Sequence, residues 1–113
     1  MTDTYISPDG RFKLHISPIP MRMSHEVLSP TLYDEQSGEI LFDPGGLWDA
    51  GSVVWAADSR TLSMLMRHYD NGLRSYRCLL DMELRTGKLI FEEKELFAGP
   101  FHEFEMFMKS GDF

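Results

Sequence analysis

The side chains that could carry catalysis or bind a metal are few in this chain, and they are scattered. Histidine serves most often in proton transfer and metal binding near neutral pH, and the four histidines stand far apart, at His15, His25, His68 and His102. They form no H-x-x-H or H-E-x-x-H pair, and the single cysteine, Cys78, cannot build a zinc cluster. We therefore predict no catalytic residue, no metal ligand and no cofactor, and the sequence gives no ground to expect an enzyme.

Two short stretches come near a chemical pattern without completing it. "MSHE" places Ser24, His25 and Glu26 side by side, but adjacent residues rarely point at one spot, because nucleophile and base usually meet through the fold. "DEQSGE" (residues 34–39) resembles the start of a calcium loop, but Pro44 stands where the bidentate glutamate should be. We interpret the first stretch as a hydrogen-bonding loop and the second as the tip of a hairpin.

Residues suited to contact a partner lie on predicted loops. "SPIPMRMSHEVLSP" (residues 17–30) has three prolines, so its early part should not form a central strand; its apolar side chains either fold over a sheet edge or meet a partner. The glycine-rich connector "DPGGLWDAG" (residues 43–51) holds a tryptophan that either packs on the core or, if exposed, anchors an interface. The predicted partner-binding residues are Met21, Met23, His25, Trp48, Tyr69 and Asp70.

The charge balance limits the kinds of partner. The net charge is −7, which disfavours nucleic acid and anionic membranes and favours encounter with a basic protein. For this reason we read "RHYDNGLRSYR" (residues 67–77) as two solvated strands around an Asp-Asn-Gly turn. The chain has no apolar run long enough to span a membrane, no signal-peptide pattern and one cysteine, so we expect a cytoplasmic protein.

Two similar turn sequences, "SPDGR" (residues 7–11) and "AADSR" (residues 56–60), indicate an internal repeat. Asp9 and Asp58 are 49 positions apart, and so are the glycines of "SGEILF" and "TGKLIF", at positions 38 and 87. A period of 40–50 residues is typical of four-stranded β units. We therefore predict a single domain of residues 1–113, with repeat units at about 5–50 and 54–97 and a covering segment at 98–113.

The sequence around each turn favours antiparallel strands. "FKLHI" after the first turn alternates apolar and polar residues, as a half-buried strand does. "TLYDEQSGEILF" and "YRCLLDMELRTGKLIF" each read as strand, turn, strand, with a glycine at the tip. We thus expect Gly38 and Gly87 to have positive φ, and Trp55, on the strand that enters the second turn, to be mostly buried.

The Ser-Pro-Asp-Gly-Arg turn before an apolar strand, its Trp-x-x-Asp-Ser-Arg counterpart at residues 55–60, and the Asp-x-x-x-Thr-Gly-like hairpins resemble the repeats of WD40-like and TolB-like β-propellers. The resemblance covers most of residues 5–93. It implies blade-like local structure, whereas the family's functions vary and do not transfer. Because propellers close with four to eight blades, two units cannot close a ring.

The predicted fold is therefore mainly β: two blade-like antiparallel units with a period of 49 form a twisted open sheet, and a C-terminal helix or strand packs on it. The tail "AGPFHEFEMFMKSGDF" favours a helix that starts at Pro100 and stops near Gly111. Phe101, Phe104 and Phe107 would then share one face with Met108, and an alternating strand remains the other interpretation. Either form is too apolar to stay uncovered.

Three functions are compatible with these observations. We expect a small non-enzymatic protein-binding module of the bacterial cytoplasm, in one version an immunity-type protein that neutralises a basic toxin domain. The alternative from another class is a ligand-binding or hydrolytic cleft between the two units, walled by His25, Trp48, Tyr69 and Asp70. A third interpretation is a structural subunit of a larger β assembly, with a homo-oligomer as its simplest form.

Overall fold

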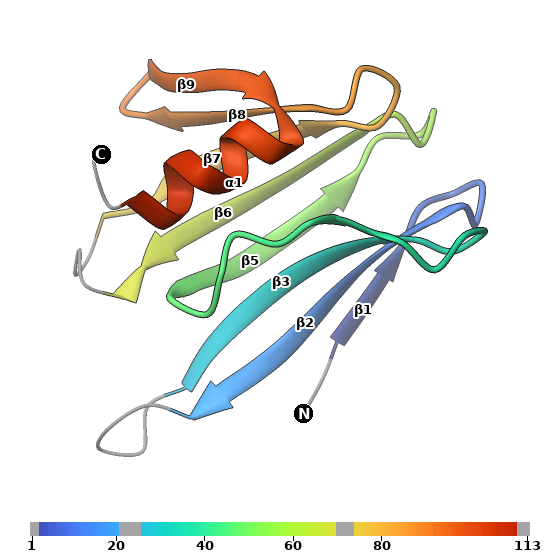
Figure 1. Cartoon of the computed structure of the whole chain (residues 1–113), viewed down its shortest axis with the longest axis horizontal. Coiled ribbons are helices and arrows are strands. Elements are labelled where there is room, and N and C mark those ends of the chain that lie inside the picture. Colours follow the sequence, from blue (N-terminus) through green and yellow to red (C-terminus); the bar gives the residue numbers. More distant parts are fainter. Residues whose placement is uncertain (1–2, 21–25, 70–73, 111–113) are drawn as a thin grey trace.

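The computed structural model describes residues 3–20, 26–69 and 74–110, which form two antiparallel sheets and one helix (Figure 1). The first sheet is a meander of four strands in the order β1-β2-β3-β4, and the second has five strands in the order β5-β6-β7-β8-β9. The strands of the first sheet are β1 (Asp3–Ile6), β2 (Phe12–Pro20), β3 (Glu26–Asp34) and β4 (Ile40–Phe42). The five-stranded sheet contains β5 (Trp48–Trp55), β6 (Thr61–His68), β7 (Tyr76–Asp81), β8 (Thr86–Phe91) and β9 (Lys94–Pro100).

The tail forms the helix α1 (Phe101–Ser110), which crosses in front of the five-stranded sheet in Figure 1. Neither sheet closes on itself, so the predicted fold class is confirmed: a mainly β protein with open antiparallel sheets and a C-terminal helix packed on them. The helix interpretation of the tail is therefore the right one. Residues 98–100, which we had assigned to the covering segment, end strand β9 instead, and α1 begins directly after Pro100.

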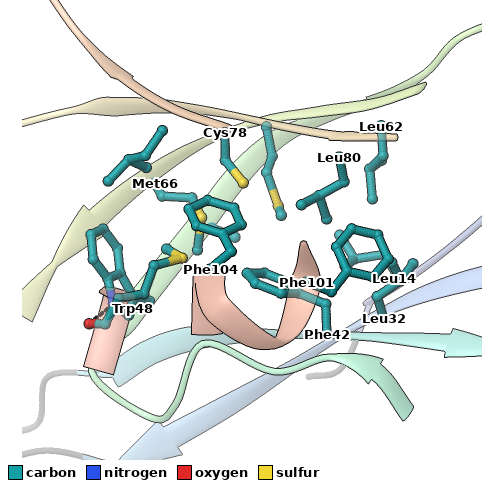
Figure 2. Close-up of a cluster of buried hydrophobic side chains, with 14 of the residues drawn as sticks. Leu14, Leu32, Phe42, Trp48, Leu62, Met66, Cys78, Leu80, Phe101 and Phe104 are labelled. Atoms are coloured by element: carbon teal, nitrogen blue, oxygen red, sulfur yellow. Dashed lines mark hydrogen bonds between the residues drawn. The ribbon is translucent and has the colours of Figure 1, made fainter. Parts of the chain in front are cut away.

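The apolar core lies between the two sheets, and the helix seals it. Figure 2 shows Phe101 and Phe104 of α1 pointing into a cluster that receives side chains from both sheets. Phe104 stacks on Phe42 of the four-stranded sheet and on Phe97 of β9, with ring centroids 5.2 Å and 5.4 Å apart. Phe101, Phe104 and Met108 are buried, and Phe107 is half-buried against Phe97. One core thus joins both repeat units.

The predicted turn repeat is present in the backbone geometry. In the first turn the Ser7 N–H donates to the Phe12 carbonyl and Gly10 N–H donates to Ser7; in the second, the same two bonds join Ala56 to Thr61 and Ser59 to Ala56. Gly10 and Ser59 both have positive φ, at 77° and 62°. All these pairs of equivalent positions are 49 residues apart, as predicted.

The repeat continues past the turns with a different spacing. Phe12 pairs with Asp34, and its counterpart Thr61 pairs with Asp81, so the equivalent aspartates at positions 34 and 81 are 47 residues apart. The β6–β7 hairpin, counted between these paired positions, is therefore two residues shorter than the β2–β3 hairpin. The residue equivalent to Gly38 (φ 73°) is Arg85 (φ 56°).

The prediction that Gly87 lies at a hairpin tip is consequently wrong, whereas that for Gly38 is confirmed. Gly87 lies within β8, paired with Leu80 and Gly99, and its φ is not positive. A Cβ at this position would lie 2.1 Å from Cδ2 of Phe104. The sequence needs glycine here because the helix packs directly against the β8 backbone.

Residues 17–30 also differ from the prediction of a loop. Their described part continues strands β2 and β3, which pair from Phe12↔Asp34 to Pro20↔Glu26. Strand β1 pairs with β2 only as far as Ile16, so Pro18 and Pro20 lie where β2 has a strand on one side alone. Proline is tolerated there because no second ladder requires its N–H.

Trp55 is half-buried, which partly meets the prediction of a mostly buried side chain. Its indole N–H donates to the Tyr5 carbonyl at 3.0 Å, and its ring stacks on Phe12. The tryptophan therefore ties the end of β5 to the first sheet. The resemblance to propeller blades stays a prediction: the first sheet is a meander of four strands, as in a blade, and the second has five.

Candidate partner-binding groove

The predicted partner-binding residues do not form one surface among the described residues. Met21, Met23, His25 and Asp70 lie outside the described residues. Tyr69 is exposed, and its backbone N–H donates to the carbonyl of Leu47, which is exposed as well. Trp48 is buried. Of the proposed set, only Tyr69 is thus seen at the surface, beside an aliphatic neighbour that we had not singled out.

Trp48 is a core residue, and its role as an exposed anchor is corrected by the structure. The side chain is 1% exposed, its indole N–H donates to the Met108 carbonyl at 3.0 Å, and its ring meets Tyr76 edge-on at 5.6 Å. The glycine-rich connector is shorter than predicted, because β5 already begins at Trp48. The tryptophan therefore fastens the C-terminal part of the helix to the start of β5.

The described residues show no arrangement suited to metal or thiol chemistry. No group of three His, Cys, Asp or Glu side chains within residues 3–20, 26–69 and 74–110 could hold a metal ion. Cys78 is fully buried, and that burial raises the pKa of its thiol far above the ordinary range, so the nucleophilic thiolate is not accessible. The hollow beside Trp48 and His68 has a volume of about 240 Å³ and is open to solvent.

A groove between strand β4 and the start of α1 combines the features that a binding surface needs. Its volume is about 400 Å³. Ile40, 53% exposed, and Leu41 line one side, and Pro100 and His102 line the other, with the buried Phe101 between them. Met106, 60% exposed, lies one turn beyond His102 on the same helical face and extends the apolar rim.

Carboxylates dominate the charge of this β4–α1 groove. Glu39 and Glu105 line it, and Glu103 is exposed in the first turn of the helix. One oxygen of Glu105 accepts the N–H of Asp43 at 2.9 Å, which fixes this carboxylate beside β4. One cation, Arg85, also lines the groove, and it stands 4.0 Å from Asp34. A basic side chain that entered the groove would therefore meet preplaced negative charge.

Strand β4 is also the open edge of its sheet. It is the last strand in the order β1-β2-β3-β4 and pairs with β3 through only two register positions, Leu32↔Phe42 and Tyr33↔Ile40. An edge strand leaves one row of backbone N–H and C=O groups without a strand partner. An extended segment of another protein can pair with such an edge and place alternate side chains in an adjoining groove.

The groove was not found from the sequence because a β-bulge changes the face to which Ile40 belongs. In a regular strand Ile40 and Phe42 would point to the same side. The register shift between Leu32 and Tyr33 leaves Phe42 in the core and turns Ile40 to solvent. A signal was nevertheless present: "SGEILF" joins a carboxylate to an apolar run directly after a turn.

No protein-family model, curated protein or solved structure matches this chain. No helix within the described part of the chain is long and apolar enough to cross a membrane. Function must therefore be argued from the surface itself.

Proposed function

We propose that this chain is a small protein-binding module whose β4–α1 groove receives an extended, basic segment of its partner. The observation that carries the proposal is the groove itself, in which the edge strand β4, the exposed side chain of Ile40 and the carboxylates of Glu39 and Glu105 lie together, with the exposed Met106 one helical turn beyond. Backbone pairing would supply affinity, and the acidic rim would select for lysine or arginine.

In its more specific form, the proposal is an immunity-type protein of the bacterial cytoplasm that neutralises a basic toxin domain. The net charge of −7 supports this version, because attraction between opposite charges speeds association and suppresses wrong partners. A groove that holds an extended segment can also block a toxin without any catalytic residue.

The test is capture of the partner from the native host with the whole chain and two charge-reversal variants. Glu39→Lys changes the groove, and Glu92→Lys makes the same charge change at an exposed position on the turn between β8 and β9. We expect the wild type and Glu92→Lys to retain a stoichiometric basic protein and Glu39→Lys to lose it. Absence of a stoichiometric partner, or equal retention by both variants, would contradict the proposal.

The immunity version has its own readout. The captured protein, expressed alone, should inhibit growth of a sensitive strain, and coexpression of the wild-type chain should relieve that inhibition. Glu39→Lys should fail to protect, whereas Glu92→Lys should protect fully. A captured protein that binds through the groove but has no effect on growth would leave the binding function in place and exclude the immunity role.

A further inference from the structure

The outer face of the five-stranded sheet, which lies on the side away from α1 in Figure 1, carries a stripe of aliphatic side chains. Strand parity places Leu65, Leu79 and Ile90 on this face, while their neighbours Met66, Cys78 and Leu89 point into the core. Leu65 is 47% exposed, and Leu79 and Ile90 are half-buried. This outer stripe therefore plays no part in the core that holds the fold together.

The register of the sheet makes the stripe continuous. Leu65 pairs with Arg77 and Leu79 pairs with Ser63, so the two leucines are diagonal neighbours on adjacent strands. Leu79 pairs with Lys88, and Arg77 pairs with Ile90, which gives Leu79 and Ile90 the same relation. Diagonal neighbours on one face are close enough for long side chains to touch. Val54, 61% exposed and paired with Ser63, extends the apolar surface onto β5.

Three cations flank the stripe: Arg67, Arg77 and Lys88. Arg67 is paired across the ladder with Asp49, which lies on the same face. Arg77 lies between Leu65 and Ile90 in the ladder, and it makes no ion pair with any residue in the described part of the chain. Lys88 lies 3.8 Å from Glu95. Arg77 is thus the one of the three cations that faces no described carboxylate, and it lies in the middle of the aliphatic stripe.

The outer face of the four-stranded sheet differs, because its polar side chains satisfy one another. Lys13 pairs with Glu35 at 2.8 Å and lies over the ring of Tyr33. His15 hydrogen-bonds Thr4 on the neighbouring strand. That face also exposes Ile6, but its cation Lys13 is neutralised by an ion pair, whereas Arg77 in the outer stripe has no ion-pair partner among the described residues.

Shallow hollows lie at both ends of the outer stripe. One, of about 260 Å³, lies beside Leu79, Leu84 and the ion-paired Asp81; the other, of about 240 Å³, lies beside Leu28, Leu65 and the facing pair Arg67 and Asp49. Apolar side chains of a ligand that ran along the stripe would enter these hollows, and a carboxylate between them would reach Arg77.

We propose that the outer stripe is a second docking surface, separate from the β4–α1 groove, and that its occupant is an amphipathic helix of a partner protein with leucine-type side chains flanked by carboxylates. A sheet covered by helices on both faces is a stable layer arrangement, and the inner face of this sheet already holds α1, an apolar helix flanked by glutamates. A second copy of this chain in a twofold arrangement centred on the stripe is disfavoured, because it would place Arg77 against its own copy.

The experiment uses the whole chain and a synthetic helical peptide of about 18 residues, or five turns, with leucine on one face and glutamate beside it. A second peptide carries lysine in place of every glutamate. Backbone and methyl NMR spectra would locate binding. We expect the acidic peptide to shift Leu65, Leu79 and Ile90, with no comparable shift at Ile40 or Met106, and the basic peptide to leave the outer stripe unchanged.

Matched variants then test the role of charge. Arg77→Glu should weaken the acidic peptide by about tenfold or more, and Arg77→Gln should weaken it less. Lys13→Glu, a charge reversal on the other sheet, should leave the affinity within about twofold. All three substitutions lie on solvent-facing positions, and thermal unfolding would check that each variant folds.

Three results would overturn the proposal: no binding of the acidic peptide at the outer stripe, equal binding of both peptides there, or equal affinity of the wild type and a folded Arg77→Gln variant. Because the proposed partner segment for the groove is basic and the one for the stripe is acidic, failure at one surface leaves the other proposal standing.

Discussion

The two meanders share their turn geometry but differ in what covers them. Both begin with a strand that leads into a tight turn with one residue at positive φ. In both, an arginine after the turn faces an aspartate on the third strand: Arg11 faces Asp34, and Arg60 faces Asp81. Only the second continues into β9 and a helix, and only its fourth strand carries a glycine beneath a buried phenylalanine. Local turn chemistry thus repeats in the sequence, whereas the helix that covers the shared core, and the glycine on which it packs, belong to the second unit alone.

This difference predicts where the protein is most sensitive. Substitutions in the shared turns change local hydrogen bonds near solvent, while substitutions beneath α1 act on the one core that both sheets use. The three experiments that follow probe the helix, two glycines and a pair of equivalent arginines, and each can confirm or refute the asymmetry.

The largest effect is expected from removal of residues 98–113. This deletes the end of β9 and the whole helix, and with it the buried side chains of Phe101, Phe104 and Met108. The burial of these three side chains contributes about 5–9 kcal/mol to folding, which is comparable to the whole stability of a domain. We expect an unfolded or aggregating product by circular dichroism and size-exclusion chromatography. Met106→Ala, at an exposed position of the same helix, is the control and should fold normally.

A truncated chain that stayed folded and monomeric would show that the sheets do not need the helix. The helix would then be an addition to the second unit that does not contribute to stability, and the phenylalanines of α1 would become candidates for partner contact.

An intermediate effect is expected at the two glycines that the sequence aligned. Gly87→Ala would force a methyl group into the ring of Phe104 and should destabilise the domain by about 2–3 kcal/mol. Gly38→Ala meets no neighbour within 4 Å but must hold φ at 73°, which should cost about 1 kcal/mol. Urea unfolding would measure both. Gly51→Ala, with open space and no positive φ, is the control and should change stability by less than about 0.5 kcal/mol.

An equal loss of stability in the two variants, or a larger loss in Gly38→Ala, would mean that the helix can move away from β8 with little energetic cost. The interpretation of Gly87 as a packing glycine would then be wrong.

The sequence predicted what depends on neighbouring residues. The turns at residues 7–11 and 56–60, the strand class and the helical tail follow from turn chemistry, from alternation and from the spacing of Phe101, Phe104 and Met108. Even the period of 49 is exact where the two turns are compared. These features need no knowledge of how the sheets meet.

The rest depended on contacts between distant segments. Gly87 looked like a turn glycine because its role arises from Phe104, 17 positions further along. The hairpin between β8 and β9 was missed because its two turn residues, Glu92 and Glu93, adopt positive φ (50° and 69°) that glycine or asparagine normally provides. The groove depends on a bulge that turns Ile40 outward, and the outer stripe depends on strand register.

The smallest effect, and the last comparison of the two units, concerns the equivalent arginine–aspartate pairs. Arg60 contacts Asp81 through Nε and Nη2 at 3.1–3.3 Å and reaches Glu83 as well, whereas Arg11 is 3.7 Å from Asp34, which also has Arg85 nearby. Partial burial raises the pKa of Asp81, but the hydrogen bonds from the Leu84 N–H and from Arg60 outweigh it, so that pKa lies below its usual value.

A carboxylate with a lowered pKa stabilises the folded state above the pKa of the unfolded chain and loses that contribution as the pH falls through the folded value. At neutral pH, Arg60→Ala should therefore lower the urea midpoint more than Arg11→Ala, and both by less than Gly38→Ala, since exposed ion pairs contribute little. As the pH falls through the lowered pKa of Asp81 and its carboxylate is protonated, the deficit of Arg60→Ala should shrink toward zero. Carboxyl NMR should show the pKa of Asp81 rising in Arg60→Ala and unchanged in Arg11→Ala. A deficit that persisted in acid would assign Arg60 a packing role, and equal deficits in the two variants would make the pairs equivalent despite their different geometry.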